Sequence, residues 1–422
     1  ERIETVRAEL GHCIHAADNP PLMALAITKT DCDAVLHLSM DFIMADWTSI
    51  RLLLAEFEGM YFYGDGVLPE FEVSFRDYLT AEALLKEKSG FYKDKKYWLD
   101  KIDTLPAAPD IAVKRSSAAD SKLFKRLYLN LEPERWNKLK SFAAKFGLTP
   151  SSAVLASYAQ VLHWWSSTDK FSLNLTVLNR FPLHEQVNSL IGDFTSVSLL
   201  ECDFTDSASF AQSARKLNAR LFDDLDHRLY SGVMVMREIA RRKGREAALM
   251  PFVYTSSIGV IQEDPARPMV GRFDGEGISQ TPQVYLDCQA MDGSFGLQVN
   301  WDYRDGIFHE NVIEDMFAAF KSLLEMLSDF AEIWSSDIPP ILPKYQAEMI
   351  AQSNSTNVQL PGGLLHSGLL DSIRRTPDKL AAADESKSFT YGELGLLASA
   401  VKLQLINTGC SVLAAPRAIL SE

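Results

Sequence analysis

Two carboxylates and a hydroxyl follow an apolar run near the start of the chain. Asp41, Asp46 and Ser49 lie in the stretch DFIMADWTS. Burying a carboxylate costs free energy unless a cation or hydrogen-bond donors compensate its charge. Such a residue either pairs with an arginine, which is the commoner outcome, or acts as a general acid or base. These residues alone leave both roles open.

Other polar residues interrupt segments that otherwise have the composition of buried strands. These residues are Asn174, Asp193, Thr255, Ser256, Gln283, Asp287 and Gln289. Threonine favours strands, so Thr255 by itself is more often structural than functional. Aspartate is disfavoured in strands, so propensity does not explain Asp287. Alternation puts Gln283, Asp287 and Gln289 on one face of the expected strand, and that face either lines a channel or meets solvent.

The familiar catalytic signatures are absent from the sequence. It contains no G-x-G-x-x-G that opens a helix after a strand, no G-x-x-x-x-G-K-[ST], no H-E-x-x-H and no G-x-S-x-G. His12, Cys13 and His15 are neighbours in GHCIH, but a metal site needs more ligands, so we expect no metal there. The chemistry must therefore be sought among the polar residues of the strands.

The composition is that of a globular protein. The chain has 422 residues, 47% of them hydrophobic and 23% charged, which indicates two or three folding units. The net charge of 42 − 56 = −14 argues against nucleic-acid binding. No secretory signal and no membrane-spanning run is recognisable. Five scattered cysteines indicate a cytoplasmic protein with reduced thiols. The chain begins without methionine, which we interpret as a fragment or a processed start.

Hydrophobic periodicity predicts mixed strands and helices, and hence an α/β or α+β architecture. A strand begins at residue 33, and a helix over 47–62 follows it, with Thr48 or Ser49 as the expected N-cap. Further strands are expected over 122–133, 171–179, 251–260, 283–292 and 295–303. Further helices are expected over 76–103, 134–147, 149–166, 209–227, 232–244 and 310–332.

Breaks in the pattern divide the chain. Pro106 and Pro109 interrupt it after the helix expected over 76–103. From residue 340 the sequence becomes polar and loop-like, as in an interdomain linker. We expect a first lobe over 1–105, a second lobe over 106–345, a linker over 346–360 and the start of another domain over 361–422.

Over residues 1 to about 345, the chain resembles the heterocyclization domain of nonribosomal peptide synthetases, a variant of the condensation domain. Its DxxxxDxxS motif, which replaces HHxxxDG of other condensation domains, is matched by Asp41, Asp46 and Ser49. Six more blocks follow in order: LPAAPDIAV, TPSSAVLASYAQVLHWWS, FSLNLTVLNRFPLH with IGDFTSVSLL, DLDHRLYSGVMVMRE, PFVYTSSIG and ISQTPQVYLDCQ. The sequence departs from the family pattern at Asp110, Ala112 and Ser157.

The two ends of the chain depart from a complete domain of this kind. The family's first blocks, FPLTxxQxAYxxGR and RHxML, are missing, so the first lobe is expected to be incomplete at the N-terminus. Residues 361–422 resemble the opening of an adenylation domain, through LLHSGLLDSIRRTPDKLAAAD and FTYGELGLLA. This part stops before any phosphate-binding loop, so we expect no ATP site in it.

The resemblance implies an α/β, two-lobed chloramphenicol-acetyltransferase-like fold with a tunnel between the lobes. It implies upstream and downstream peptidyl or aryl carrier domains as partners, each presenting a phosphopantetheine thioester, and no cofactor bound directly. The implied reaction joins a carrier-bound acyl group to carrier-bound Cys, Ser or Thr, and then cyclizes the amide to a thiazoline or oxazoline. Siderophores and thiazole antibiotics are compatible products. A domain that only condenses, or only docks carriers, is the alternative.

The resemblance also implies roles for the polar residues. Asp287 would be the acid and base of cyclization, with Thr255 as its hydrogen-bond partner or proton relay. Asn174 and Ser256 would orient the substrate, and Gln283, Gln289 and Asp193 would line the tunnel.

Within the DxxxxDxxS motif the implied roles are structural. Asp46 would pair with Arg180 in LNRFPLH and hold the lobe junction, with Asp41 and Ser49 also structural. Ala45 occupies the position of the second motif histidine, so that catalytic role would be lost.

Overall fold

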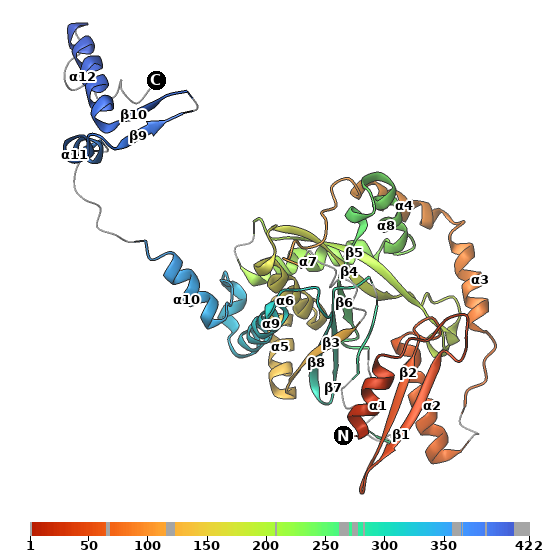
Figure 1. Cartoon of the computed structure of the whole chain (residues 1–422). Coiled ribbons are helices and arrows are strands. Elements are labelled where there is room, and N and C mark those ends of the chain that lie inside the picture. The colour runs from red at the N-terminus through yellow and green to blue at the C-terminus, as the bar shows by residue number, and fades with distance from the viewer. Residues whose placement is uncertain are drawn as a thin grey trace. The chain divides into compact units, whose positions relative to one another are not determined.

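The chain is described by a computed structural model over residues 2–64, 68–114, 123–206, 209–260, 270–271, 277–281, 283–356, 364, 366–384 and 386–408. It divides into two compact units, residues 1–347 and 348–422 (Figure 1). The first unit ends close to the boundary expected at residue 345. The other expected boundaries remain predictions.

The centre of the first unit is a mixed six-stranded sheet with the order β3-β8-β7-β6-β4-β5. Its strands are β3 (Phe124–Leu131), β4 (Lys170–Leu178), β5 (Thr195–Asp203), β6 (Phe252–Ser256), β7 (Leu286–Gly293) and β8 (Gly296–Arg304). The pairs β4–β6 and β6–β7 are parallel, and the other neighbours are antiparallel. All five strands expected for this region are present.

One face of this sheet is apolar and is covered by helices. Leu173 and Leu175 of β4 point into the core, as do Trp301 of β8 and Leu286 of β7, and all four are nearly inaccessible. The covering helices are α5 (Pro133–Lys145), α6 (Pro150–Trp165), α7 (Phe210–Leu225) and α9 (Val312–Asp329) (Figure 1). Because strand side chains alternate, the residues between these positions point to the opposite face.

The N-terminal elements form a separate two-stranded sheet and two helices. The strands β1 (Met23–Lys29) and β2 (Ala34–Met40) pair in antiparallel fashion, with Met23 opposite Met40. The helix α1 (Arg2–Gly11) packs against this hairpin, and α2 (Trp47–Tyr63) follows it. The strand and helix expected on either side of DFIMADWTS are therefore confirmed, although the strand already ends at Met40.

The segment 76–103 forms two helices instead of the single helix that was predicted. They are α3 (Phe75–Leu85) and α4 (Ser89–Lys101), and Lys88 is extended at the start of the second. Serine and glycine at 89 and 90 are weak helix formers, which favours a break and a new start there. A further helix, α8 (Gly232–Lys243), contacts β5.

Two further expectations about element limits were wrong. The linker expected over 346–360 overlaps the helix α10 (Lys344–Ser353), whose sequence has no glycine or proline and several strong helix formers. The strand β7 begins at Leu286, so Gln283 lies in the preceding turn and not on the face that carries Asp287.

The second unit is small. It holds α11 (Ser367–Arg375), a hairpin of β9 (Leu380–Ala383) and β10 (Ser388–Thr390), and α12 (Tyr391–Asn407). Thr390 and Glu393 form a capping box at the start of α12. Across the described residues of both units, no helix has the length and apolarity needed to cross a membrane.

Gly296, where the β7–β8 hairpin enters β8, is a specific test of this packing. Its φ is +97°, and a Cβ there would lie 2.2 Å from the backbone oxygen of Leu131. Gly244, at the end of α8, has φ +94° but no atom within 4 Å of such a Cβ. We expect Gly244→Ala to cost about 1–2 kcal/mol through backbone strain alone. Gly296→Ala adds a clash with backbone.

The thermal melting temperatures of the two variants test this difference. Gly296→Ala should melt clearly below Gly244→Ala, since only the former must displace the start of α5. Equal melting temperatures for the two variants contradict the close approach between the hairpin and Leu131.

Candidate functional site

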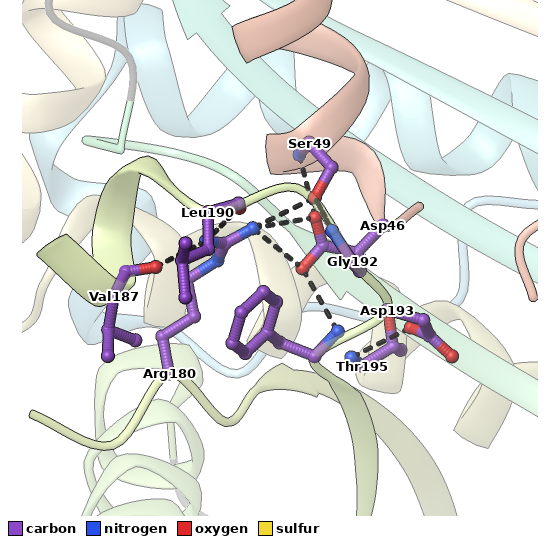
Figure 2. A network of polar contacts seen from close by, with 9 residues as sticks. Asp46, Ser49, Arg180, Val187, Leu190, Gly192, Asp193 and Thr195 are labelled. Carbon is purple, nitrogen blue, oxygen red and sulfur yellow. Dashed lines mark hydrogen bonds and ion pairs between the residues drawn. The ribbon is translucent and has the colours of Figure 1, made fainter. Parts of the chain in front are cut away.

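A buried ion pair joins Asp46 of the DxxxxDxxS motif to Arg180 (Figure 2). Asp46 precedes α2, and Arg180 follows β4. The Arg180 Nη2 atom lies 3.0 Å from Asp46 Oδ1 and 3.3 Å from Oδ2. The carboxylate side chain is 0% exposed and the arginine side chain 7%. The predicted pair is therefore confirmed, and it joins segments 134 residues apart.

Ser49 extends this pair into a network. Its Oγ donates to the Gly192 carbonyl at 2.8 Å and accepts from Gly192 N and from Arg180 Nη2. Arg180 Nη1 also donates to the carbonyls of Val187 and Leu190. Figure 2 shows the bonds from Asp46, Ser49, Val187 and Leu190 meeting at the arginine. The network fixes the start of α2 against the loop between β4 and β5.

Asp46, and neither Thr48 nor Ser49, is the N-cap of α2. Its Oδ1 accepts from Ser49 N at 2.7 Å, so one carboxylate both caps the helix and pairs with the arginine. Aspartate is among the best N-cap residues. Asp41 lies outside this network, because its Oδ1 accepts from Ile43 N in a local turn.

Asp193 borders the same loop. Its Oδ1 accepts from Thr195 N at 2.9 Å, as Figure 2 shows. It lines a cavity of about 110 Å³ together with Asn179, Arg228 and Ser231. The tunnel-lining role expected for it stays a prediction.

A second polar cluster lies on the sheet face opposite the covering helices. Thr255 of β6 donates to Thr176 Oγ1 of β4 at 2.8 Å or to Asp287 Oδ1 of β7 at 3.2 Å. The register places Thr176 opposite Thr255 and Val253 opposite Asp287. The structure thus brings together the two residues, 32 positions apart, that the sequence analysis had assigned to acid–base chemistry.

The environment of Asp287 raises the pKa of its carboxyl group from 3.8 to about 6. Burial is the main cause, because it disfavours the charged form. The hydrogen bond from Gln289 acts against it, the negative charge of Asp302 adds to it, and Thr255 and Arg126 lower it. A carboxyl group with a pKa near 6 can both take and give a proton near neutral pH.

The neighbours of Asp287 include residues that the sequence analysis missed. Gln289 Nε2 donates to Asp287 Oδ2 at 2.7 Å and to Asp302 Oδ2 at 3.3 Å. Asp302 lies on β8 and pairs with Arg126 of β3. An aspartate inside the strand predicted over 295–303 is as unfavourable as Asp287, so the same propensity argument could have identified Asp302.

Asn174 and Ser256 lie on opposite faces of the sheet. Asn174, on the same face of β4 as Thr176, has a buried Oδ1 without a hydrogen-bond partner among the described residues. Such an oxygen is suited to accept from a ligand, since buried polar atoms are otherwise almost always paired. Ser256 contacts Ser151 Oγ of α6 at 2.8 Å, on the helix-covered face. It therefore does not belong to the cluster around Asp287.

Metal ligands do not gather in the part of the chain that the structure describes. No group of three or more His, Cys, Asp or Glu side chains there has the arrangement to hold an ion. The Thr255–Asp287 cluster consists of hydroxyl, amide and carboxyl groups. It is suited to proton transfer and hydrogen bonding.

Comparison with known proteins identifies a family and several relatives of this chain. The family description "Condensation domain" matches residues 3–338. The chain is 37% identical over 409 residues to pyochelin synthetase PchF of Pseudomonas aeruginosa, covering 95% of this chain and 22% of the relative. It is 32% identical over 398 residues to phenyloxazoline synthase MbtB of a Mycobacterium species, covering 93% and 33%. The chain thus spans about a fifth to a third of these curated relatives.

A solved structure supports the same relationship. The cyclization-docking bidomain of EpoB from Sorangium cellulosum is similar with a TM-score of 0.68 and 30% identity, covering 78% of this chain and 66% of that one. The α/β condensation fold expected from the sequence is confirmed by such matches.

Loss of Arg180 tests the buried pair. Arg180→Met leaves the Asp46 carboxylate buried without its cation, and breaking a buried pair in this way costs about 3–5 kcal/mol. All seven tryptophans precede residue 335, so tryptophan fluorescence during urea unfolding reports on the first unit alone.

Asp41→Asn is the matched control for this experiment. Asparagine can still accept from Ile43 N, so this change should alter the free energy of unfolding by no more than about 0.5 kcal/mol. Similar urea midpoints for Arg180→Met and Asp41→Asn would show that the pair does not hold the two segments together.

Proposed function

The chain belongs to the Condensation domain family, and from this premise we propose that it carries out heterocyclization in a nonribosomal peptide synthetase. In this proposal it joins a carrier-bound acyl group to carrier-bound Cys, Ser or Thr. It then removes water from the new amide to form a thiazoline or oxazoline ring. The observation that carries the proposal is the Thr255–Asp287 pair on the sheet face opposite the covering helices.

The cyclization step requires two proton transfers. The side-chain thiol or hydroxyl attacks the amide carbonyl carbon, and its proton passes through Asp287 to the former carbonyl oxygen. The amide N–H proton then passes through Asp287 to the resulting hydroxyl, which leaves as water while the C=N bond forms. Both hydrogens of the water are thereby accounted for, and Asp287 returns to its ionised form.

In this proposal Thr255 assists these transfers. Its hydroxyl is within reach of both Asp287 Oδ1 and Thr176 Oγ1, so it can hold the carboxyl group in one orientation or relay a proton. Asn174, whose side-chain oxygen has no hydrogen-bond partner in the described part of the chain, can accept from the amide or the attacking group. Ala45 stands in the motif where other condensation domains have histidine, so amide formation here relies on positioning more than on a base.

The names of the relatives support the choice of reaction. One is a phenyloxazoline synthase and another is a cyclization-docking bidomain. The pyochelin synthetase adds siderophore assembly as a context. In this proposal the partners are carrier domains on both sides, each presenting substrate on phosphopantetheine, and an adenylation domain that begins near residue 361.

Removal of the Asp287 carboxyl group should separate the two half-reactions. We expect Asp287→Ala to form the linear amide and to lose at least about 100-fold in ring formation, the usual scale of a general acid–base contribution. The full-length protein is supplied with both loaded carriers, and the product is weighed by mass spectrometry. The heterocycle is one water lighter than the amide.

Asp305→Ala is the matched control, since Asp305 follows the same sheet and pairs only with the exposed Lys125 among the contacts described. It should cyclize normally. Full ring formation by Asp287→Ala overturns the assignment of Asp287, and unsubstituted protein that yields the amide alone overturns heterocyclization. Absence of any amide favours a carrier-docking role.

The pH dependence of ring formation gives an independent test. The pKa of Asp287 is raised to about 6, so the fraction able to accept a proton increases as the pH rises through that value. Ring formation from a preloaded linear amide should therefore rise between about pH 5 and pH 7 and then level off. Single-turnover rates measure this directly. A flat profile over that range is incompatible with Asp287 as the base.

A further inference from the structure

Two carboxylates face each other across adjacent strands beside the proposed site. Asp287 of β7 is directly opposite Asp302 of β8 in the strand register. Like charges at opposed positions repel, and burial strengthens the repulsion. Arg126 of β3 supplies a compensating cation from the position opposite Asp302 on the far side.

Arg126 holds Asp302 through both of its oxygens. The Nε–Oδ1 and Nη2–Oδ2 distances are each 2.6 Å, and the Asp302 side chain is 0% exposed. The backbone N–H of Ser279 donates to the same Oδ2 at 2.8 Å. This bidentate geometry fixes both partners and is stronger than a single ion contact.

The same arginine determines which way the Gln289 amide points. Arg126 Nη2 lies 3.4 Å from Gln289 Oε1, so the amide oxygen turns toward the guanidinium. The amide nitrogen then faces the carboxylates, and it donates to Asp287 Oδ2 at 2.7 Å. If the amide were reversed, its oxygen would face two carboxylates, and Asp287 Oδ2 would lose the donor that Gln289 supplies.

We propose that the Arg126–Asp302 pair is a positioning device for the acid–base residue, acting through Gln289 to hold Asp287 in its ionised, proton-accepting state before cyclization. This inference rests on the proposed heterocyclization and deepens it. Gln289, Arg126 and Asp302 are positioning residues in this scheme, because none of them needs to touch the substrate.

The groups that face Asp287 fix the direction of each expected effect. Among the described residues, Thr255 of β6 and Gln289 of β7 bond to Asp287, and Asp302 of β8 lies opposite it. Thr176 of β4 bonds to Thr255, and Arg126 of β3 bonds to Asp302. Removing the cation raises the pKa of Asp287, and removing the Asp302 charge lowers it. Removing both charges together leaves it nearly unchanged.

The test is the pH at which ring formation from a preloaded linear amide reaches half its maximum in the full-length protein. For Arg126→Met we expect this midpoint to move up by about one pH unit or more. For Asp302→Asn it should move down, and for the double variant it should return close to the unsubstituted value. Amide formation from the same preparations shows that each variant is folded.

Gln289→Leu keeps the experiment decisive if a single charge change prevents folding. It removes the amide donor but leaves the Arg126–Asp302 pair intact, so the midpoint should again move up. Lys125→Met is the matched control on β3. Its side chain pairs with Asp305 at 2.9 Å and is 57% exposed, so the midpoint should stay in place.

The outcomes distinguish a failure of the positioning role from a failure of the proposed heterocyclization. If the unsubstituted protein cyclizes and the variants form amide with unmoved midpoints, the positioning role is wrong while heterocyclization stands. If the unsubstituted protein forms only the amide, heterocyclization fails and the positioning role fails with it. Opposite shifts for Arg126→Met and Asp302→Asn, cancelled in the double variant, support the inference.

Discussion

The architecture of the first unit depends on compensating one buried carboxylate. Asp46 is excluded from water at the start of α2, and Arg180 supplies both its counter-charge and the link to the loop after β4. An uncompensated charge at this buried position is strongly unfavourable. The start of α2 and the loop after β4 are therefore held together in the folded unit. The N-terminal elements are thereby fixed to the six-stranded sheet that carries the polar cluster.

A second buried carboxylate, that of Asp287, has neutral hydrogen-bond donors in place of an ion pair. Asp287 receives neutral donors from Thr255 and Gln289, and none of the described residues pairs a cation with it directly. Burial raises the pKa of Asp287 against the effect of these donors, whereas Asp46 is enclosed in an ion pair and a helix cap. The same residue type thus has a structural role at one place and a chemical role at the other, and the difference lies in the partners that the fold supplies.

Much of the fold could be predicted from local patterns. The alternation of apolar residues located β4 and β8, and helical spacing located α9. Local patterns failed where boundaries depend on weak preferences, as at the break between α3 and α4 and at the helix α10. They also placed Gln283 in β7, because alternation in a sequence does not show where strand pairing begins.

The sequence by itself determined the residue types that matter: an aspartate motif, an arginine after a strand, and polar residues in strands that should be apolar. It also implied, through family blocks, that Asp46 meets Arg180 and that Thr255 meets Asp287. Only the tertiary structure decided that Asp302, Arg126 and Gln289 surround Asp287, and that Ser256 turns away from it. Strand order and register create these contacts, and neither is encoded in a local run of residues.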